Sequence, residues 1–274
     1  MVDSAAGLRE RVAANRRIAW PIALYFLLFV PLISFTAPTG SDPVDPSIQA
    51  LQLLAYAITA LMIGVARLSL TEFRIDKLTV ILFLLFGTFL RLPSSTDDPS
   101  SVYSIYYGFG VVALALVGLI LRSRSARNRW APVSWGWLGL GLISGLGLAL
   151  AIALLGTIAS GSRFSLYTGP PLTTAGLIFA FLYAMGHSAI IEEPAFRGFL
   201  WGYLEQHRWK GVGIWLFQGA LFWLSHFRYF DRPLMFWVAL PAGGLIFGWL
   251  SWRSRSVAAC LVAHAAYNGL GAFL

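Results

Sequence analysis

The sequence predicts an all-α membrane protein, a polytopic bundle of about eight or nine transmembrane helices. Three observations support this: the composition, the recurrence of apolar segments and the distribution of basic residues. Of the 274 residues, 58% are hydrophobic and 12% are charged, whereas soluble proteins carry about 25% charged residues. The mean hydropathy is +0.71. These values exclude an ordinary soluble enzyme, a disordered chain and a fibrous protein.

Apolar segments recur along the chain at close to the roughly 20 residues that cross a bilayer as a helix. We expect nine spans, at residues 18–36, 47–68, 78–92, 102–121, 135–159, 173–197, 212–227, 234–252 and 257–273. The first follows Arg16 and Arg17 without a small-residue cleavage site after it, so we interpret it as a retained span. The third is short, which leaves eight spans as an alternative. We find no room for a soluble domain.

The basic residues predict the orientation. With nine spans and a cytoplasmic N-terminus, 16 of the 20 Lys and Arg residues lie in cytoplasmic loops, tails and helix ends. Such an excess is typical of the cytoplasmic side of membrane proteins. We therefore assign the net charge of +8 to orientation in a bilayer, and we expect no nucleic-acid partner. The protein is predicted to be integral to the cell membrane, with its C-terminus outside.

Glycines at helical spacing predict close contacts between helices. We expect this role for Gly139, Gly141, Gly145 and Gly147 in the fifth segment, and for Gly243 and Gly244 in the eighth. The single cysteine, Cys260, excludes an internal disulfide and a cysteine-based metal cluster.

Ionisable groups inside spans are costly and indicate function by default. In this chain they are concentrated in the last third: Glu192, Glu193 and Arg197 in the sixth segment, His226 in the seventh, and His264 with Asn268 in the ninth. We therefore divide the chain into N-terminal transmembrane segments of unknown role, 1–170, and a core at 171–274 that carries the chemistry.

Helical spacing separates the two adjacent acids. Glu193 lies four residues before Arg197, so the two share a helix face and can pair, which would keep one carboxylate ionised. Glu192 is rotated by about 100° from Glu193 and can face another neighbour. Pro194 removes one helical hydrogen bond and is expected to bend the helix.

The sixth and seventh segments predict a hairpin that turns near 209–211. In that hairpin Glu192 and His226 are expected at the same depth in the membrane, and His264 in the ninth segment is expected at a similar depth. A glutamate in such a cavity can act as general base on water, and His and Asn donors can hold the oxyanion of a carbonyl. Glu192, His226 and His264 are equally an acceptable zinc set. Metal-free catalysis by the glutamate is favoured by the absence of an H-E-x-x-H helix, but zinc stays an alternative.

Three short motifs then resemble one family. The run from Glu192 to Arg197 resembles the E-E-x-x-x-R signature of the CAAX protease and bacteriocin-processing (CPBP) family. The run from Phe222 to His226 resembles its F-x-x-x-H motif, and His264 with the following residues its H-x-x-x-N motif. Each motif alone is weak, but the three in order, in successive apolar segments, are specific.

The resemblance implies an intramembrane endopeptidase related to the type II CAAX prenyl endopeptidases. It implies Glu192 as the base that activates water, supported by Glu193 and Arg197. The remaining active-site residues it implies are His226, His264 and Asn268. The implied substrate is a membrane-associated protein or peptide, lipidated or bearing a leader. Two other functions stay open: a non-catalytic scaffold or immunity-type protein of the same fold, and a proton-coupled transporter, which would more often carry buried charges in both halves.

Overall fold

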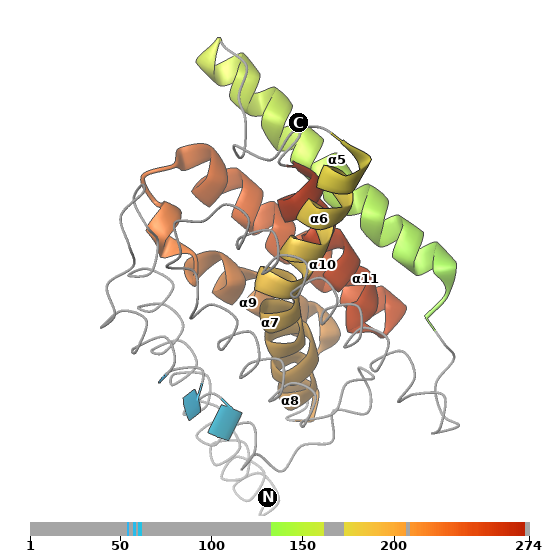
Figure 1. Ribbon diagram of the computed structural model, residues 1–274. Helices are drawn as coiled ribbons and strands as arrows, with labels where there is room; N and C mark the ends of the chain where they lie inside the picture. The colour runs from blue at the N-terminus through green and yellow to red at the C-terminus, as the bar shows by residue number, and fades with distance from the viewer. Residues whose placement is uncertain are drawn as a thin grey trace, which may run out of the picture.

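The computed structural model describes residues 133–161, 173–206 and 209–271, together with positions 54, 57, 58, 60 and 61 (Figure 1). Every regular element in these ranges is helical. The predicted spans 18–36, 78–92 and 102–121 lie outside the described residues, as does most of 47–68. The all-helical class is thus confirmed for the described part of the chain, while the total of eight or nine spans stays a prediction.

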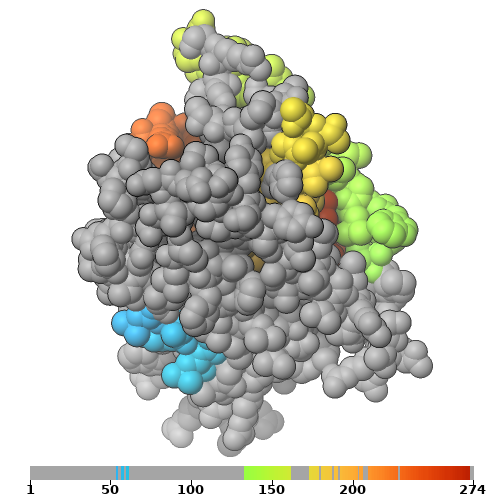
Figure 2. Space-filling model, viewed as in Figure 1, coloured from blue at the N-terminus to red at the C-terminus, as the bar shows by residue number. Residues whose placement is uncertain are grey.

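Helix α5, Trp135–Ser160, closely matches the predicted fifth span. It ends at Gly161, which takes a left-handed backbone conformation (φ 65°) and donates its N–H to the carbonyl of Thr157. Leu154, Leu155 and Ile158 are exposed on α5, and Figure 2 shows this helix on the outside of the molecule. A helix that is apolar on all sides and still exposes such residues is typical of a membrane span.

Helix α5 packs along α11, Val257–Ala265. A Cβ at Gly141 would collide with the carbonyl of Ala259, and a Cβ at Gly145 with the carbonyl of Ala263. The contacts advance in the same direction along both helices, so α5 and α11 are parallel. This agrees with their predicted places as the fifth and ninth spans, which cross in the same direction.

The expectation for the glycines holds only in part. Gly139 and Gly147 have open space where a Cβ would stand, because they point away from α11. Gly244 lies tightly against Gly219, whereas Gly243 has only ordinary contact distances. The sequence spacing identified the right helices, but not which glycines face a partner.

The sixth segment forms an unbroken helical run that extends to Gln206 instead of ending at Arg197. It consists of α6 (Thr174–Ala184), the π-helical turn η2 (Met185–Ala189), α7 (Ile190–Glu193), a second π-helical turn η3 (Pro194–Leu200) and α8 (Trp201–Gln206). Pro194 stands at the first position of η3 with helical dihedral angles. The wider turn thus accommodates the residue that lacks an N–H donor.

Three further helical segments follow this run among the described residues. Helix α9, Gly211–Leu224, is followed by the 3₁₀ turn η4, Phe227–Tyr229. The π turn η5, Met235–Ala239, then leads into α10, Leu240–Ser254, and α11 continues into a last π turn, η6, Ala266–Leu270. Because α9 ends at Leu224, His226 lies in the turn after the helix, with φ −102° and ψ 27°. The predicted helical span to residue 227 was therefore too long.

Two stretches in the described part are long and apolar enough to cross a membrane, Trp135–Ser160 and Met235–Ser254. Three shorter apolar helices accompany them, Thr174–Ala184, Gly211–Leu224 and Val257–Leu270. Figure 1 shows α11 between α5 and the remaining helices. Its residues Val257–Ala265 are almost entirely buried, so this element forms the centre of the core and carries His264 into it.

Candidate active site

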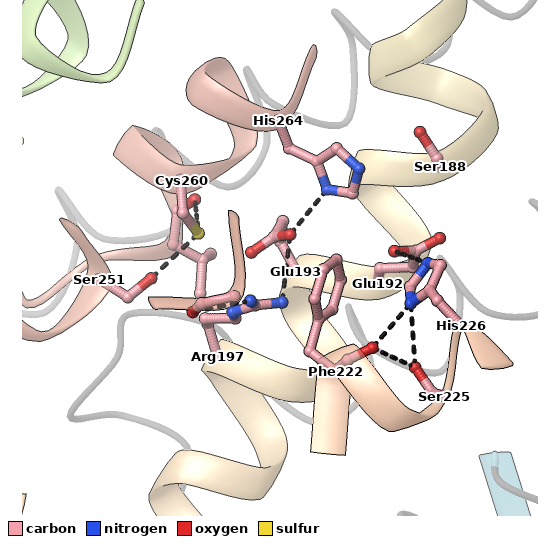
Figure 3. Close-up of polar contacts among 12 residues, drawn as sticks. Ser188, Glu192, Glu193, Arg197, Phe222, Ser225, His226, Ser251, Cys260 and His264 are labelled. Carbon is pink, nitrogen blue, oxygen red and sulfur yellow. Dashed lines mark hydrogen bonds and ion pairs between the residues drawn. The ribbon is translucent and has the colours of Figure 1, made fainter. Parts of the chain in front are cut away.

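Glu193 is the centre of a fully buried polar cluster. Its Oε1 accepts a hydrogen bond from His264 Nδ1 at 2.7 Å and a second from an Arg197 NH1 hydrogen at 3.3 Å (Figure 3). Arg197 NH2 donates to the carbonyl of Gly244 on α10, also at 3.3 Å. The side chains of Glu193 and Arg197 are both 0% exposed. A buried charge pair is stable only when its hydrogen-bond partners are in place. Here η3 supplies Arg197, α10 supplies the carbonyl of Gly244 and α11 supplies His264.

Aromatic rings enclose this cluster. The guanidinium carbon of Arg197 lies 4.3 Å from the centroid of the Phe222 ring, within the range of a cation–π contact. The His264 ring stacks on Phe247 with centroids 5.1 Å apart and an interplanar angle of 20°. These rings keep water from the ion pair and hold the imidazole plane, so Nδ1 of His264 stays directed at Glu193.

Glu192, one residue earlier, faces a different neighbour. Its Oε2 lies 3.7 Å from Nε2 of His226, and the two side chains are 13% and 8% exposed. At that distance the atoms are in ion-pair range but beyond a direct hydrogen bond. Oε2 has no hydrogen-bond partner among the described residues. The carboxylate is thus enclosed by protein and yet has an oxygen free for another group.

The hydrogen bond of His226 determines which ring nitrogen faces Glu192. Nδ1 lies 2.7 Å from the carbonyl oxygen of Phe222. A carbonyl can only accept, so Nδ1 carries the hydrogen and donates it. In the neutral ring, Nε2 is then an acceptor directed at the same space as Glu192 Oε2. The end of α9 makes this possible, because the Phe222 carbonyl lies in the last turn of that helix, where carbonyls lack helical partners.

The predicted site residues therefore fall into two groups. The pairing of Glu193 with Arg197 and the proximity of Glu192 to His226 are both found. His264, however, bonds to Glu193 and not to Glu192. Asn268 lies in η6, exposed, and its Nδ2 donates to Ser188 Oγ at 3.0 Å.

The zinc alternative required Glu192, His226 and His264 as one set of ligands. The described residues contain no group of three or more His, Cys, Asp or Glu side chains that could hold a metal ion. The donors are arranged as two separate pairs, one imidazole to each carboxylate. In this arrangement they do not fit a three-ligand zinc site.

Four contributors to the site were missed by reasoning from the sequence. These are the hydroxyl of Ser188, the ring of Phe247, the carbonyl of Gly244 and the hydroxyl of Ser225, which donates to the Phe222 carbonyl at 2.8 Å. Only Ser188 had a local signal, since it precedes Glu192 by one helical turn of four residues. The others come from helices that are distant in sequence or from backbone atoms, for which a residue pattern carries no signal.

One known family matches the segment that contains these residues. Residues 174–270 match the family described as type II CAAX prenyl endopeptidase Rce1-like. The match covers about a third of the 274 residues and runs from the first residue of α6 to the last of η6. Neither a curated protein nor a solved structure matches the chain.

The fold and the match together define the class: a helical, membrane-embedded hydrolase that acts as a protease on a peptide or protein substrate. Residues 174–270 are thus similar to the Rce1-like, CAAX-protease family, which is the family that the three motifs resemble. Helix α5 lies outside the match, although it packs against α11. The division of the chain at residue 170 stays a prediction.

Proposed function

We propose that the protein is an intramembrane endopeptidase in which Glu192 activates the attacking water. The observation that carries this proposal is the free Oε2 of Glu192, which lies beside Nε2 of His226 at the edge of the buried cluster. A general base must have an accessible acceptor atom near the proton that it removes. Glu193 also has an Oε2 without a hydrogen-bond partner among the described residues, but its side chain is 0% exposed and its Oε1 is engaged by Arg197 and His264, so a substrate water has less access to it.

His226 would orient the water. With its hydrogen on Nδ1, Nε2 is an acceptor, so Glu192 and His226 together offer an acceptor to each hydrogen of one water. The oxygen lone pair of that water is then free to attack a peptide carbonyl. Glu192 takes the proton, the carbonyl oxygen becomes an oxyanion, and the same proton passes to the leaving amine as the C–N bond breaks.

The oxyanion needs hydrogen-bond donors that are already in place. We assign this role to His264 and Asn268. Glu193 accepts from Nδ1 of His264 and holds the imidazole ring in place, and Nε2 can donate to the oxyanion when both ring nitrogens carry a hydrogen. Asn268 has an amide nitrogen with two hydrogens on an exposed side chain. Glu193 and Arg197 contribute indirectly, because Glu193 holds His264 in place and Arg197 holds Glu193.

We further propose that the substrate is a membrane-associated protein, lipidated or bearing a leader segment, and that it is cut in the cytoplasmic half of the cell membrane. The excess of basic residues supports a cytoplasmic N-terminus and an external C-terminus. Reporter fusions at the two ends should accordingly give opposite results. Equal results at both ends would contradict nine spans.

The experiment compares membranes from cells that lack the protein and are complemented with one of three forms. These are the wild type, Glu192→Gln and a control, Glu205→Gln. The control removes a carboxylate on α8 that lies away from the site and forms an ion pair with Arg255, with Oε1 and NH1 3.5 Å apart. Quantitative sequencing of new peptide termini should reveal products with the wild type and the control, but not with Glu192→Gln. If no terminus depends on Glu192, the protease proposal is wrong, and a non-catalytic scaffold would explain the fold better.

A further inference from the structure

We infer that Ser188 is a positioning residue for the amide of Asn268, an inference that rests on the proposed protease function. Ser188 lies in the π turn η2, and Asn268 lies in the π turn η6, 80 residues later. Asn268 Nδ2 and Ser188 Oγ are 3.0 Å apart. The run that carries the two glutamates is thus linked to α11 by the hydrogen bond of His264 to Glu193, and to η6 by this contact.

The direction of the contact follows from a second hydrogen bond. Ser188 Oγ donates its only hydrogen to the carbonyl of Ala184 at 3.1 Å, one turn earlier in the helix. The hydroxyl can therefore only accept from Asn268. A rotated amide would place Oδ1 against an oxygen that has no hydrogen left to give. Ser188 consequently selects the orientation in which the NH2 group of Asn268 faces it.

This selection matters for an oxyanion donor. One hydrogen of Asn268 Nδ2 is donated to Ser188 Oγ. Because the amide group is planar, its second hydrogen points about 120° away from the first. Asn268 is exposed while its neighbours Tyr267 and Gly269 are buried, so the free hydrogen points out of the packed core. Without Ser188 the amide can rotate, and a donor that must reorganise during the reaction stabilises the transition state less than one already in place.

Packing places both residues. A Cβ at Gly269 would collide with the backbone of Ala180 on α6, so η6 and α6 lie in close backbone contact beside Asn268. Ser188 also precedes Glu192 by four residues, which places the amide one turn from the proposed base. The single hydroxyl thus links the proposed oxyanion donor to the helix that carries the base.

The test uses the full-length protein in detergent or liposomes and a substrate identified by the terminus experiment. We expect Ser188→Ala to lower kcat about tenfold with little change in KM, less than the 10²–10³ lost with a whole oxyanion donor. Ser188→Thr keeps the hydroxyl and should retain most of the activity. The matched control is Thr157→Ala, which removes a hydroxyl bonded at the same four-residue spacing to Ala153 in α5, away from the site. It should leave kcat unchanged.

A double-mutant cycle separates positioning from a merely structural role. In the Asn268→Ala background, Ser188→Ala should cause no further loss of kcat, because there is no amide left to orient. An equal loss in both backgrounds, or full activity of Ser188→Ala beside an active wild type, would overturn the role of Ser188 alone. Absence of any cleavage by the wild type would instead overturn the proposed function.

Discussion

Glu192 and Glu193 are the same residue type in the same helical turn, yet the tertiary structure places them in opposite environments. Glu193 is 0% exposed and accepts hydrogen bonds from a guanidinium and an imidazole. Glu192 is 13% exposed and has one histidine at 3.7 Å. Each acid has one oxygen without a hydrogen-bond partner among the described residues, so the two differ in exposure and in the partners of the other oxygen. The ring of Phe222 contacts both Arg197 and His226 and lies between the two groups (Figure 3).

This difference shows how one short motif can combine stability with reactivity. A carboxylate that accepts from a guanidinium and an imidazole in a 0% exposed site contributes to a rigid scaffold, but its burial keeps it from a substrate. A carboxylate one residue away, turned by about 100°, remains open to a substrate.

Glu192→Gln should have the largest effect on activity. The substitution keeps the shape and hydrogen-bonding capacity of the side chain but removes the proton acceptor, so kcat/KM should fall by about 10²–10⁴. The melting temperature in detergent should stay close to that of the wild type, since no charge partner is stranded in the core. Near-full cleavage by this variant would show that Glu192 is not the base, so that either the roles of the two acids are reversed or the protease proposal is wrong.

Glu193→Gln should have the largest effect on stability. It leaves Arg197 buried without its counter-charge, and an uncompensated buried charge costs about 3–5 kcal/mol. The free energy of unfolding and the activity should fall together, and Arg197→Gln added to it should restore part of the stability. Thermal denaturation of the two single variants, the double variant and Glu205→Gln as control measures this. An inactive Glu193→Gln with unchanged stability would contradict a supporting role.

Gly145→Ala should have a smaller effect and tests how the buried group is held in place. The added Cβ would collide with the carbonyl of Ala263, directly before His264. Overpacking of this kind costs about 1–3 kcal/mol, and a displaced α11 should also reduce cleavage by moving His264 from Glu193. Gly147→Ala is the matched control, because nothing lies where its Cβ would stand. Equal stability of the two variants would mean that α5 does not brace the site.

Removal of metal should have no effect. The two histidines are divided between the two carboxylates, and the described residues form no three-ligand group. Protein stripped with a chelator should therefore cleave at the original rate, with metal content measured on the same sample. Zinc at about one equivalent per chain, with activity lost on stripping and regained on adding zinc, would show that the two groups converge on one ion.

Local features of the site followed from the sequence because they depend on helix geometry alone. The spacing of Glu193 and Arg197 predicted their ion pair, and the apolar run of the fifth segment predicted α5 to within a residue at its end. The proximity of Glu192 and His226 also followed, since a short hairpin between α8 and α9 brings residues at equal distances from the turn to one level.

The sequence by itself determined which residues are polar within an apolar chain, and which of them share a helix face. Only the tertiary structure decided that His264 binds Glu193 and not Glu192, since the rotation of α11 depends on its contacts with α5 and α10. The end of α9 before His226 and the π turns at Ser188, Arg197 and Asn268 are likewise decided by packing and hydrogen bonds between segments. The physical reason is that residue periodicity specifies the faces of each helix, whereas the meeting of two faces depends on the close contacts, such as Gly145 against Ala263, that set rotation and depth.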